Sequence, residues 1–320
     1  MSNPKRMVRR GIKKHPLNRT QHNYNLEPMQ KPIVVVGAVR NGERTVFKEY
    51  HRIKKALGNF EQVHFFVVES DSTDRTVEKL EQLKKEGTHF NYTSLGNLAQ
   101  QFPKRTARLA HCRNTYLTEL KNPKYSTAQY VLVADLDGTN NLLSKEGVQS
   151  CWDFEGWDVC TANQKGLYYD VWALRHPFLS PNDCWAHYDF VVENFQTKSL
   201  EALTKTVRSR QFRIPRHAKP IEVASAFGGL ALYKKETLKN ARYTGLDAQG
   251  REVCEHVPFH QQIQQQGYKI FINPKLINCR PPKEHTQLSI KRRLLHWAEA
   301  LYPGFPKSKL FAHLKKKHQQ

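Results

Sequence analysis

Two kinds of pattern alternate over the first 137 residues, and each predicts a different element. Continuous apolar runs rich in Val, Ile, Leu and Phe are typical of strands buried on both faces, and they lie at 33–36, 63–68 and 130–134. Amphipathic or Arg-rich stretches predict helices at 43–57, 74–83 and 104–121. With a short strand at 90–92, this alternation predicts an α/β fold with a mainly parallel sheet flanked by helices.

The second half of the chain is less regular. Candidate strands lie at 157–161, 169–174, 221–227 and 268–272. Candidate helices lie at 187–204 and 258–266, with Pro258 at the first position of the second. We expect Asn273-Pro274 to close the last strand. Because no linker is visible between 137 and 160, we expect a mixed extension of the same sheet within a single domain.

Charge divides the chain into three parts. It has 51 Lys and Arg residues against 29 Asp and Glu, a formal net charge of +22. Residues 1–31 and 287–320 each carry eight basic residues and one acidic residue, so together they hold +14 of that charge. We predict a basic extended arm at 1–31, a folded domain at 32–286 and a basic amphipathic tail at 287–320. Basic tails suit an anionic partner, either nucleic acid or a lipid surface.

The sequence also predicts where in the cell the protein is located. It has no run of 18 apolar residues and no apolar core behind its basic N-terminus, so we expect neither a transmembrane helix nor a secretory signal peptide. Six Cys without a CxxC pair argue for reduced thiols in a cytoplasmic, non-secreted protein. In the tail, Leu294, Trp297 and Leu301 stand near Lys291 and Arg292, which suits peripheral attachment to an anionic membrane. Packing of residues 288–301 on the folded domain is the alternative.

Three of the predicted parallel strands end in polar side chains that suit a nucleotide. These are Arg40 and Asn41 after the first strand, Glu69 and Asp71 after the second, and Asp135 and Asp137 after the fourth. Since ligands bind beyond the carboxyl ends of parallel strands, we expect one site at this edge of the sheet. Ordinary capping of the next helix by Ser72 or Asp74 is the alternative for the second cluster.

Asp135 and Asp137 are the clearest candidates for metal binding. Two carboxylates one residue apart on an extended chain point to the same side, and they repel each other unless a cation lies near them. Mg²⁺ and Mn²⁺ prefer such hard oxygen ligands and accept phosphate oxygens in the same shell. A pair of loop carboxylates that caps the following turn is the alternative.

Arg113, Asn114 and His256 are further candidates. Arg113 and Asn114 lie on the predicted Arg-rich helix and suit phosphate or nucleotide contacts. His256 and His260 are four residues apart, but Pro258 predicts that His256 lies just outside the helix. One neutral His could complete a shell of carboxylates and diphosphate around Mn²⁺, and a half-buried structural His is the alternative.

The chain resembles glycosyltransferases of the GT-A fold, a Rossmann-like nucleotide-sugar-binding fold, and within them the capsule-associated α-1,3-mannosyltransferase family of fungi and its bacterial and viral relatives. The resemblance covers about 32–280. It rests on the order and spacing of VGAVRN at 36–41, ESDSTD at 69–74, Arg108 with Arg113 and Asn114, LVADLD at 132–137, YYD at 168–170, ALR at 173–175, FGGLALY at 227–233 and CEH at 254–256.

The resemblance implies a nucleotide-sugar donor, GDP-mannose first, a divalent metal (Mn²⁺ or Mg²⁺), and a glycan or lipid-linked glycan as acceptor in surface polysaccharide or glycan synthesis. It implies that Asp137 ligates the metal, that Asp135 contacts the ribose or a metal-bound water, and that His256 is a late metal or diphosphate ligand. Gly37, Glu69 and Asp71 would line the nucleotide pocket. Gly228 and Gly229 would let the backbone approach the donor sugar, with a tight bend between two strands as the alternative.

Three questions stay open at this level. If the transfer inverts the anomeric configuration, a carboxylate must act as base, and Glu255 and Asp170 are the candidates; a retaining reaction needs no strong base. A basic nucleic-acid-binding protein is the alternative from another class, although the charge lies in the tails rather than among aromatic residues, so we expect no nucleic acid. A sugar nucleotidyltransferase would also use two aspartates, but 37–42 is a poor phosphate loop.

Overall fold

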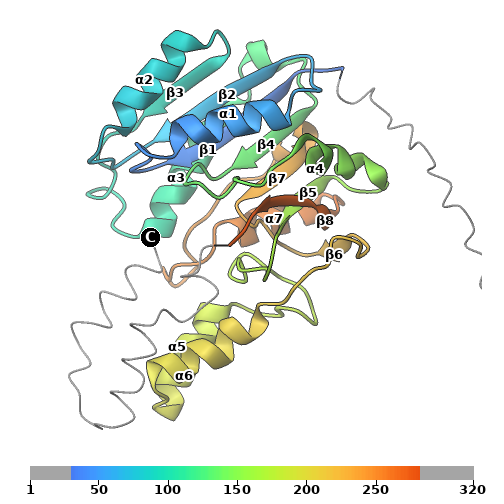
Figure 1. The fold of residues 1–320 in the computed structure, drawn as a ribbon. Helices are drawn as coiled ribbons and strands as arrows, with labels where there is room; N and C mark the ends of the chain where they lie inside the picture. The colour runs from blue at the N-terminus through green and yellow to red at the C-terminus, as the bar shows by residue number, and fades with distance from the viewer. Residues whose placement is uncertain (1–29, 282–320) are drawn as a thin grey trace, which may run out of the picture.

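One eight-stranded sheet runs through the molecule in the order β3-β2-β1-β4-β7-β5-β8-β6 (Figure 1). The structure is a computed structural model and describes residues 30–281. Apolar side chains form one large core on each face of the sheet. Helices α1, α2 and α4 contribute to one core, and α3 and α7 contribute to the other. The predicted α/β fold, a mixed and mainly parallel sheet flanked by helices, is therefore confirmed.

The N-terminal half is regular. Its strands are β1 (Ile33–Val39), β2 (Val63–Glu69), β3 (Phe90–Ser94) and β4 (Tyr130–Ala134). Its helices are α1 (Val46–Ala56), α2 (Thr76–Glu86) and α3 (Arg105–Glu119). All pairs among these four strands are parallel, so their carboxyl ends lie at one edge, as predicted. The apolar pattern of 74–83 suggests that Val77, Leu80 and Leu83 share the buried face of α2, but Val77 is 39% exposed while Leu80 and Leu83 are buried.

The C-terminal half extends the sheet with mixed strand directions. Its strands are β5 (Val159–Gln164), β6 (Ile221–Val223), β7 (Leu230–Lys234) and β8 (Ile270–Cys279). Its helices are α4 (Lys145–Gln149), α5 (Cys184–Phe195), α6 (Ser199–Thr206) and α7 (His256–Gln265). Strand β7 lies antiparallel between β4 and β5, β5 and β8 are parallel, and β6 is antiparallel to β8.

Two predicted elements of this half are wrong because longer-range contacts override the local pattern. The segment 169–174 is a loop rather than a strand, since its flanking backbone bonds to distant loops: Tyr168 N donates to Phe212 O, and Arg175 N donates to Ser225 O. The predicted helix 187–204 is two helices. Gln196 adopts a left-handed conformation (φ 50°), which ends α5 and turns the chain into α6.

Two boundaries near the end of the domain also differ from the prediction. Strand β8 continues through Pro274, because the register of β5 shifts there and Asn163 Nδ2 donates to Pro274 O instead of the regular pairing. Helix α7 begins at His256, so this residue lies inside the helix and Pro258 is the third helical residue. Proline is tolerated there because the first-turn N–H groups have no partner within the helix.

The predicted basic arm and basic tail lie outside the described residues, except for residues 30 and 31. Within 30–281, none of the helices combines the length and the apolar character that a membrane span needs.

Candidate active site

A cavity of about 650 Å³ opens at the carboxyl edge of β1, β2 and β4. This volume suits a ligand of nucleotide-sugar size. Ten of the predicted site residues line the cavity: Arg40, Asn41, Asp71, Arg113, Asp135, Asp137, Asp170, Gly229, Glu255 and His256. The structure therefore brings together, in one place, residues that are up to 216 positions apart, from Arg40 to His256.

Four predicted site residues lie outside the cavity lining and have structural partners instead. A Cβ on Gly37 would lie 2.5 Å from Ala134 O, so this glycine allows β1 and β4 to pack closely. Glu69 is buried and accepts hydrogen bonds from Ser72 N (3.0 Å) and Ser94 Oγ. Gly37 and Glu69 therefore stabilise the strand ends without lining the cavity.

Asn114 and Gly228 are the other two. Asn114 exchanges two hydrogen bonds of 2.9 Å with the backbone of Tyr243. Gly228 adopts φ 71°, and a Cβ there would lie 2.5 Å from Gln164 Nε2. This matches the tight bend that was the alternative for the glycine pair, while the following Gly229 (φ 85°) lines the cavity.

Backbone and side-chain hydrogen bonds join the ends of β1 and β2. Asn41 (φ 53°) and Asp71 (φ 57°) are both left-handed, a conformation that costs a non-glycine residue about 1–2 kcal/mol. Asn41 N donates to Ser72 Oγ (3.0 Å), and Asn41 Oδ1 accepts from Thr73 N (2.8 Å). Asp71 Oδ1 accepts from Ala99 N (2.8 Å). These bonds hold both strained residues in place at the cavity wall.

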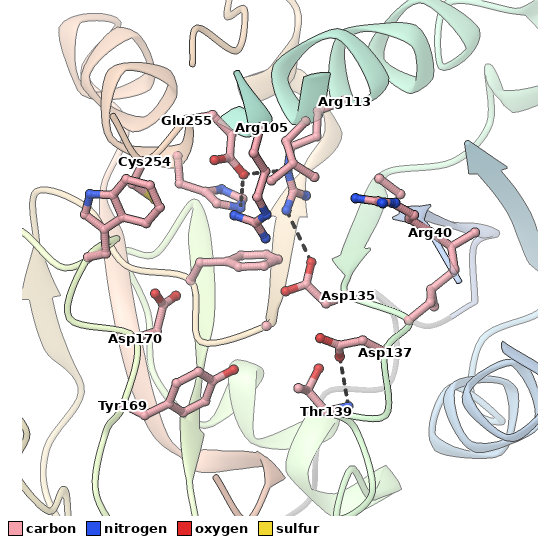
Figure 2. A pocket seen from close by; sticks show the side chains of 18 of the residues that line it. Arg40, Arg105, Arg113, Asp135, Asp137, Thr139, Tyr169, Asp170, Cys254 and Glu255 are labelled. Atoms are coloured by element: carbon pink, nitrogen blue, oxygen red, sulfur yellow. Dashed lines mark hydrogen bonds and ion pairs between the residues drawn. The ribbon is translucent and has the colours of Figure 1, made fainter. Parts of the chain in front are cut away.

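Arg113 connects the two halves of the site. Its guanidinium donates to Glu255 (Nε–Oε1, 2.9 Å) and to Asp135 (Nη2–Oδ1, 3.2 Å), as Figure 2 shows. Its Cζ lies 5.2 Å and 5.6 Å from the ring centroids of Phe227 and Tyr243. Burial alone would lower the pKa of Arg113, but Tyr116, Glu255 and Asp135 hold it well above its ordinary value. The cavity therefore contains a permanent, buried positive charge.

Asp135 and Asp137 differ in their surroundings. Burial raises the pKa of Asp135 to about 7, although Arg113 opposes this effect. Asp137 is exposed, and its Oδ1 accepts from Thr139 N (3.2 Å). Figure 2 shows both carboxylates on the cavity wall that also carries Thr139. Asp137 therefore has an oxygen available to a ligand, whereas Asp135 is held by Arg113.

The two histidines of α7 also differ. His260 is satisfied, since Ser225 Oγ lies 2.9 Å from Nδ1 and Tyr233 OH lies 2.7 Å from Nε2. His256 is buried and stacks on Phe227 with ring centroids 3.8 Å apart, yet neither of its ring nitrogens has a hydrogen-bond partner within 30–281. Nε2 lies 3.9 Å from Glu255 Oε1, beyond hydrogen-bond distance. Burial holds the pKa of His256 well below its ordinary value, so the ring is neutral and one nitrogen keeps a lone pair that accepts no hydrogen bond.

The residues present fit a divalent cation in part. A carboxylate oxygen of Asp137 and a neutral nitrogen of His256 are ligands that Mn²⁺ accepts, and both residues line the cavity. Among residues 30–281, no three His, Cys, Asp or Glu side chains form a ready metal site. A cation here would therefore need further oxygen ligands from the molecule that binds with it.

Sequence reasoning missed the other end of the cavity. Trp172 and Trp185 are half-buried there, and Leu203 and Val207 come from α6 and the residue after it. These residues come from a loop and from the helical hairpin that α5 and α6 form. The positions of both depend on long-range contacts, so no local motif points to them. Arg105, at the start of α3, is also missing from the residues that the sequence predicts for the site. It lines the cavity, and within 30–281 it has neither a hydrogen bond nor an ion pair.

Comparison with known proteins gives one family match. The family model described as Cryptococcal mannosyltransferase 1 matches residues 44–262, which is more than half of the chain. No curated protein sequence matches.

Several solved structures match this chain at low identity. Mannosyltransferase PcManGT from Pyrobaculum calidifontis, in complex with GDP-Man and Mn²⁺, has a TM-score of 0.45 and 14% identity over 90% of this chain and 70% of that chain. TarS 1–349 from S. aureus, in complex with UDP-GlcNAc, has a TM-score of 0.44 and 14% identity over 79% and 60%. Glucosyl-3-phosphoglycerate synthase from Mycobacterium tuberculosis, in complex with Mn²⁺, uridine-diphosphate and phosphoglyceric acid, has a TM-score of 0.40 and 12% identity over 89% and 84%.

Proposed function

Because the chain belongs to the Cryptococcal mannosyltransferase 1 family and is a glycosyltransferase, we propose that it transfers mannose from GDP-mannose to a glycan or lipid-linked glycan. The observation that carries this proposal is the shared cavity of Asp137, His256 and Arg113 at the carboxyl edge of the parallel strands. It combines oxygen and nitrogen ligands for a cation with a fixed positive charge, which is what a departing nucleoside diphosphate requires.

In this proposal the nucleoside lies at the β1–β2 end of the cavity. Arg40, Asn41 and Asp71 form that wall. Asp71 Oδ2 is buried and lies 3.8 Å from Arg108 Nε, but it accepts no hydrogen bond within 30–281. A carboxylate oxygen in that state suits the N–H groups of a base or the hydroxyl groups of a ribose. Figure 2 shows Arg105 reaching into the same cavity, where its unpaired guanidinium suits the diphosphate.

Asp137 and His256 would hold Mn²⁺ or Mg²⁺, with diphosphate oxygens in the remaining positions. When bound, the cation would neutralise the negative charge that develops on the leaving diphosphate. Arg113 keeps Asp135 and Glu255 in place beside it. Asp135 would then contact the ribose or a metal-bound water rather than the cation itself.

For an inverting reaction, Asp170 suits the role of base better than Glu255. Burial raises the pKa of Asp170, and its Oδ2 is fixed by Gly228 N at 2.8 Å. Glu255 Oε1 is engaged by Arg113 at 2.9 Å. A retaining reaction would need neither carboxylate as base, and the acceptor proton could pass to the leaving phosphate. The acceptor would enter at the end lined by Trp172 and Trp185.

We further propose that the protein works in the cytoplasm, attached to an anionic membrane surface through the basic residues of 287–320. An acceptor carried on a lipid would be made accessible by such attachment. The product would then serve surface polysaccharide or glycan synthesis.

A panel of nucleotide sugars tests the proposed reaction. With Mn²⁺ and no acceptor, we expect slow release of GDP from GDP-mannose and much less nucleotide release from the corresponding UDP-sugars. Chelation by EDTA should stop the release, and added Mn²⁺ should restore it. Full turnover after exhaustive chelation would contradict the metal role, and preference for a UDP-sugar would contradict the proposed donor.

A further inference from the structure

Helix α5 has an unusually apolar sequence for a helix that is so exposed. Eight of its twelve residues are apolar or aromatic: Cys184, Trp185, Ala186, Tyr188, Phe190, Val191, Val192 and Phe195. Only Cys184 is buried. Figure 1 shows α5 beside α6 at the lower end of the molecule, away from the sheet. This helix therefore lacks a partner on one side within residues 30–281.

Two phenylalanines mark the uncovered side of α5. Phe190 is 54% exposed and Phe195 is 67% exposed, and their rings contact each other with centroids 5.7 Å apart. Among the described residues only five large apolar side chains are exposed, and Phe178 (91%) in the loop before α5 is another of them. Three of the five thus fall within 18 positions of sequence, on α5 and in the loop before it. Adjacent exposed aromatic rings mark an interaction surface.

One acidic side chain beside the exposed rings is available to a basic partner. Glu193 is exposed on α5, where no hydrogen bond or ion pair within 30–281 engages it, whereas Glu201 of α6 is paired with Lys205 at 2.7 Å. A two-fold related copy seated on this face of α5 would bring Glu193 near the same carboxylate of its partner, and an anionic lipid surface would also repel it. A basic amphipathic segment complements both the apolar rings and Glu193.

The chain itself has such a segment, and it follows the described part closely. Leu294, Trp297 and Leu301 recur at spacings of three and four residues, beside Arg292 and Arg293. Their distance from the domain is short, because residues 282–287 can span about 20 Å.

The described chain ends next to the hairpin. Arg280 lines the same cavity as Trp185 of α5 and Leu203 of α6. Pro281 lies beside Gly166, where an added Cβ would be 3.7 Å from the proline Cδ. The continuation of the chain therefore starts at the wall of the cavity to which α5 and α6 also contribute.

We propose that residues 288–301 dock on helix α5, with their apolar side chains against Phe190 and Phe195 and with Arg292 or Arg293 beside Glu193. The occupant is this chain's own segment, so the membrane attachment proposed above would then rest on the later basic residues, the cluster at 315–317 among them, rather than on the whole of 287–320. The inference does not depend on the identity of the donor or the acceptor.

Hydrogen exchange of the full chain tests the docking. We expect the amides of α5 to exchange about tenfold faster when Leu294, Trp297 and Leu301 are all replaced by Asp, because the covering segment is lost. The matched control replaces Leu310, Phe311 and Leu314 by Asp and should leave α5 unchanged. Amides of α1 should stay protected in both variants, which shows that the domain is folded.

A charge reversal gives a second, independent readout. Glu193→Lys should also increase exchange in α5, and adding Arg292→Glu and Arg293→Glu to that variant should restore part of the protection. Identical α5 exchange in the wild type and the triple Asp variant would overturn the proposal. Protection that disappears on dilution would overturn it in favour of a second copy, and protection that appears only with anionic vesicles would overturn it in favour of a lipid surface.

Discussion

The two ends of the cavity are built in different ways. At the β1–β2 end, Asn41 and Asp71 sit in strained conformations that hydrogen bonds from neighbouring loops hold in place. At the opposite end, Trp185 and Leu203 come from a hairpin that contributes only a small apolar cluster of its own. The first end can recognise a ligand through fixed polar groups, whereas the second offers apolar surface and shape.

This contrast suits a transferase with one constant and one variable substrate. Fixed hydrogen-bonding groups discriminate strongly, because a wrong ligand leaves buried polar atoms unpaired. Apolar surface discriminates weakly and accepts related shapes. We therefore expect substitutions at the first end to change donor use, and substitutions at the second end to change acceptor use.

The largest expected effect is on the transfer rate, at the proposed cation ligand. Asp137→Ala should lower the transfer rate by about 10³-fold, because the exposed carboxylate is the proposed cation ligand. The thermal unfolding temperature should change little, since within residues 30–281 this side chain makes only one hydrogen bond, to Thr139 N. Thr139→Ala, which keeps that backbone N–H, is the matched control. Unchanged transfer and unchanged Mn²⁺ dependence in Asp137→Ala would remove the site assignment.

His256 should matter for the cation and His260 should not. His256→Ala should weaken the apparent Mn²⁺ affinity by about 10–100-fold, because its unpartnered nitrogen is the proposed ligand. His260→Ala should mainly lower stability, because it leaves Ser225 and Tyr233 without their partner. Mn²⁺ titrations of activity distinguish the two, and a larger loss of Mn²⁺ affinity in His260→Ala would reverse the assignment.

A paired experiment tests the two ends directly. Trp185→Ala should raise the KM for the acceptor by about tenfold and leave donor hydrolysis unchanged, because the lost contact is aromatic stacking at the hairpin end. Arg40→Ala should raise the KM for the donor and leave the KM for the acceptor unchanged. If both variants affect the same substrate, the assignment of the two ends is wrong.

The smallest expected effect is on the pH dependence of the free energy of unfolding. The pKa of His260 is lowered by burial and by Arg113 to about 3, below the ordinary value of 6.5. Between pH 6.5 and 3 the unfolded chain therefore binds a proton that the folded chain does not, so this group makes the free energy of unfolding fall as the pH falls. The slope is at most about 1.4 kcal/mol per pH unit.

His260→Gln should remove this contribution. Buried carboxylates such as Asp170, whose pKa is raised, act in the opposite direction, so the informative quantity is the difference between variant and wild type. Denaturant unfolding at several pH values measures it. A difference that does not vary with pH would show that His260 takes up a proton in the folded state.

The sequence predicted the first half of the fold well because buried parallel strands leave continuous apolar runs. It predicted the segment 169–174 wrongly because the backbone there bonds to 212 and 225, partners that no local pattern reveals. The same limit applies to the site. A polar residue at a strand end is visible in the sequence, but the direction of its side chain is not, and Glu69 therefore turned out to support the loop from outside the cavity.

Arg113 has a consequence for the timing of catalysis. Its charge is clamped between two aromatic rings and two carboxylates, and its pKa is too high for it to lose a proton at any physiological pH. The field that it creates is therefore the same in the empty site, in the loaded site and after the nucleotide departs. The water around a solvent-exposed charge would have to reorient at each of these stages. The buried guanidinium is already oriented before substrate binds. In the proposed reaction, this part of the site therefore adds little reorganisation energy to the chemical step.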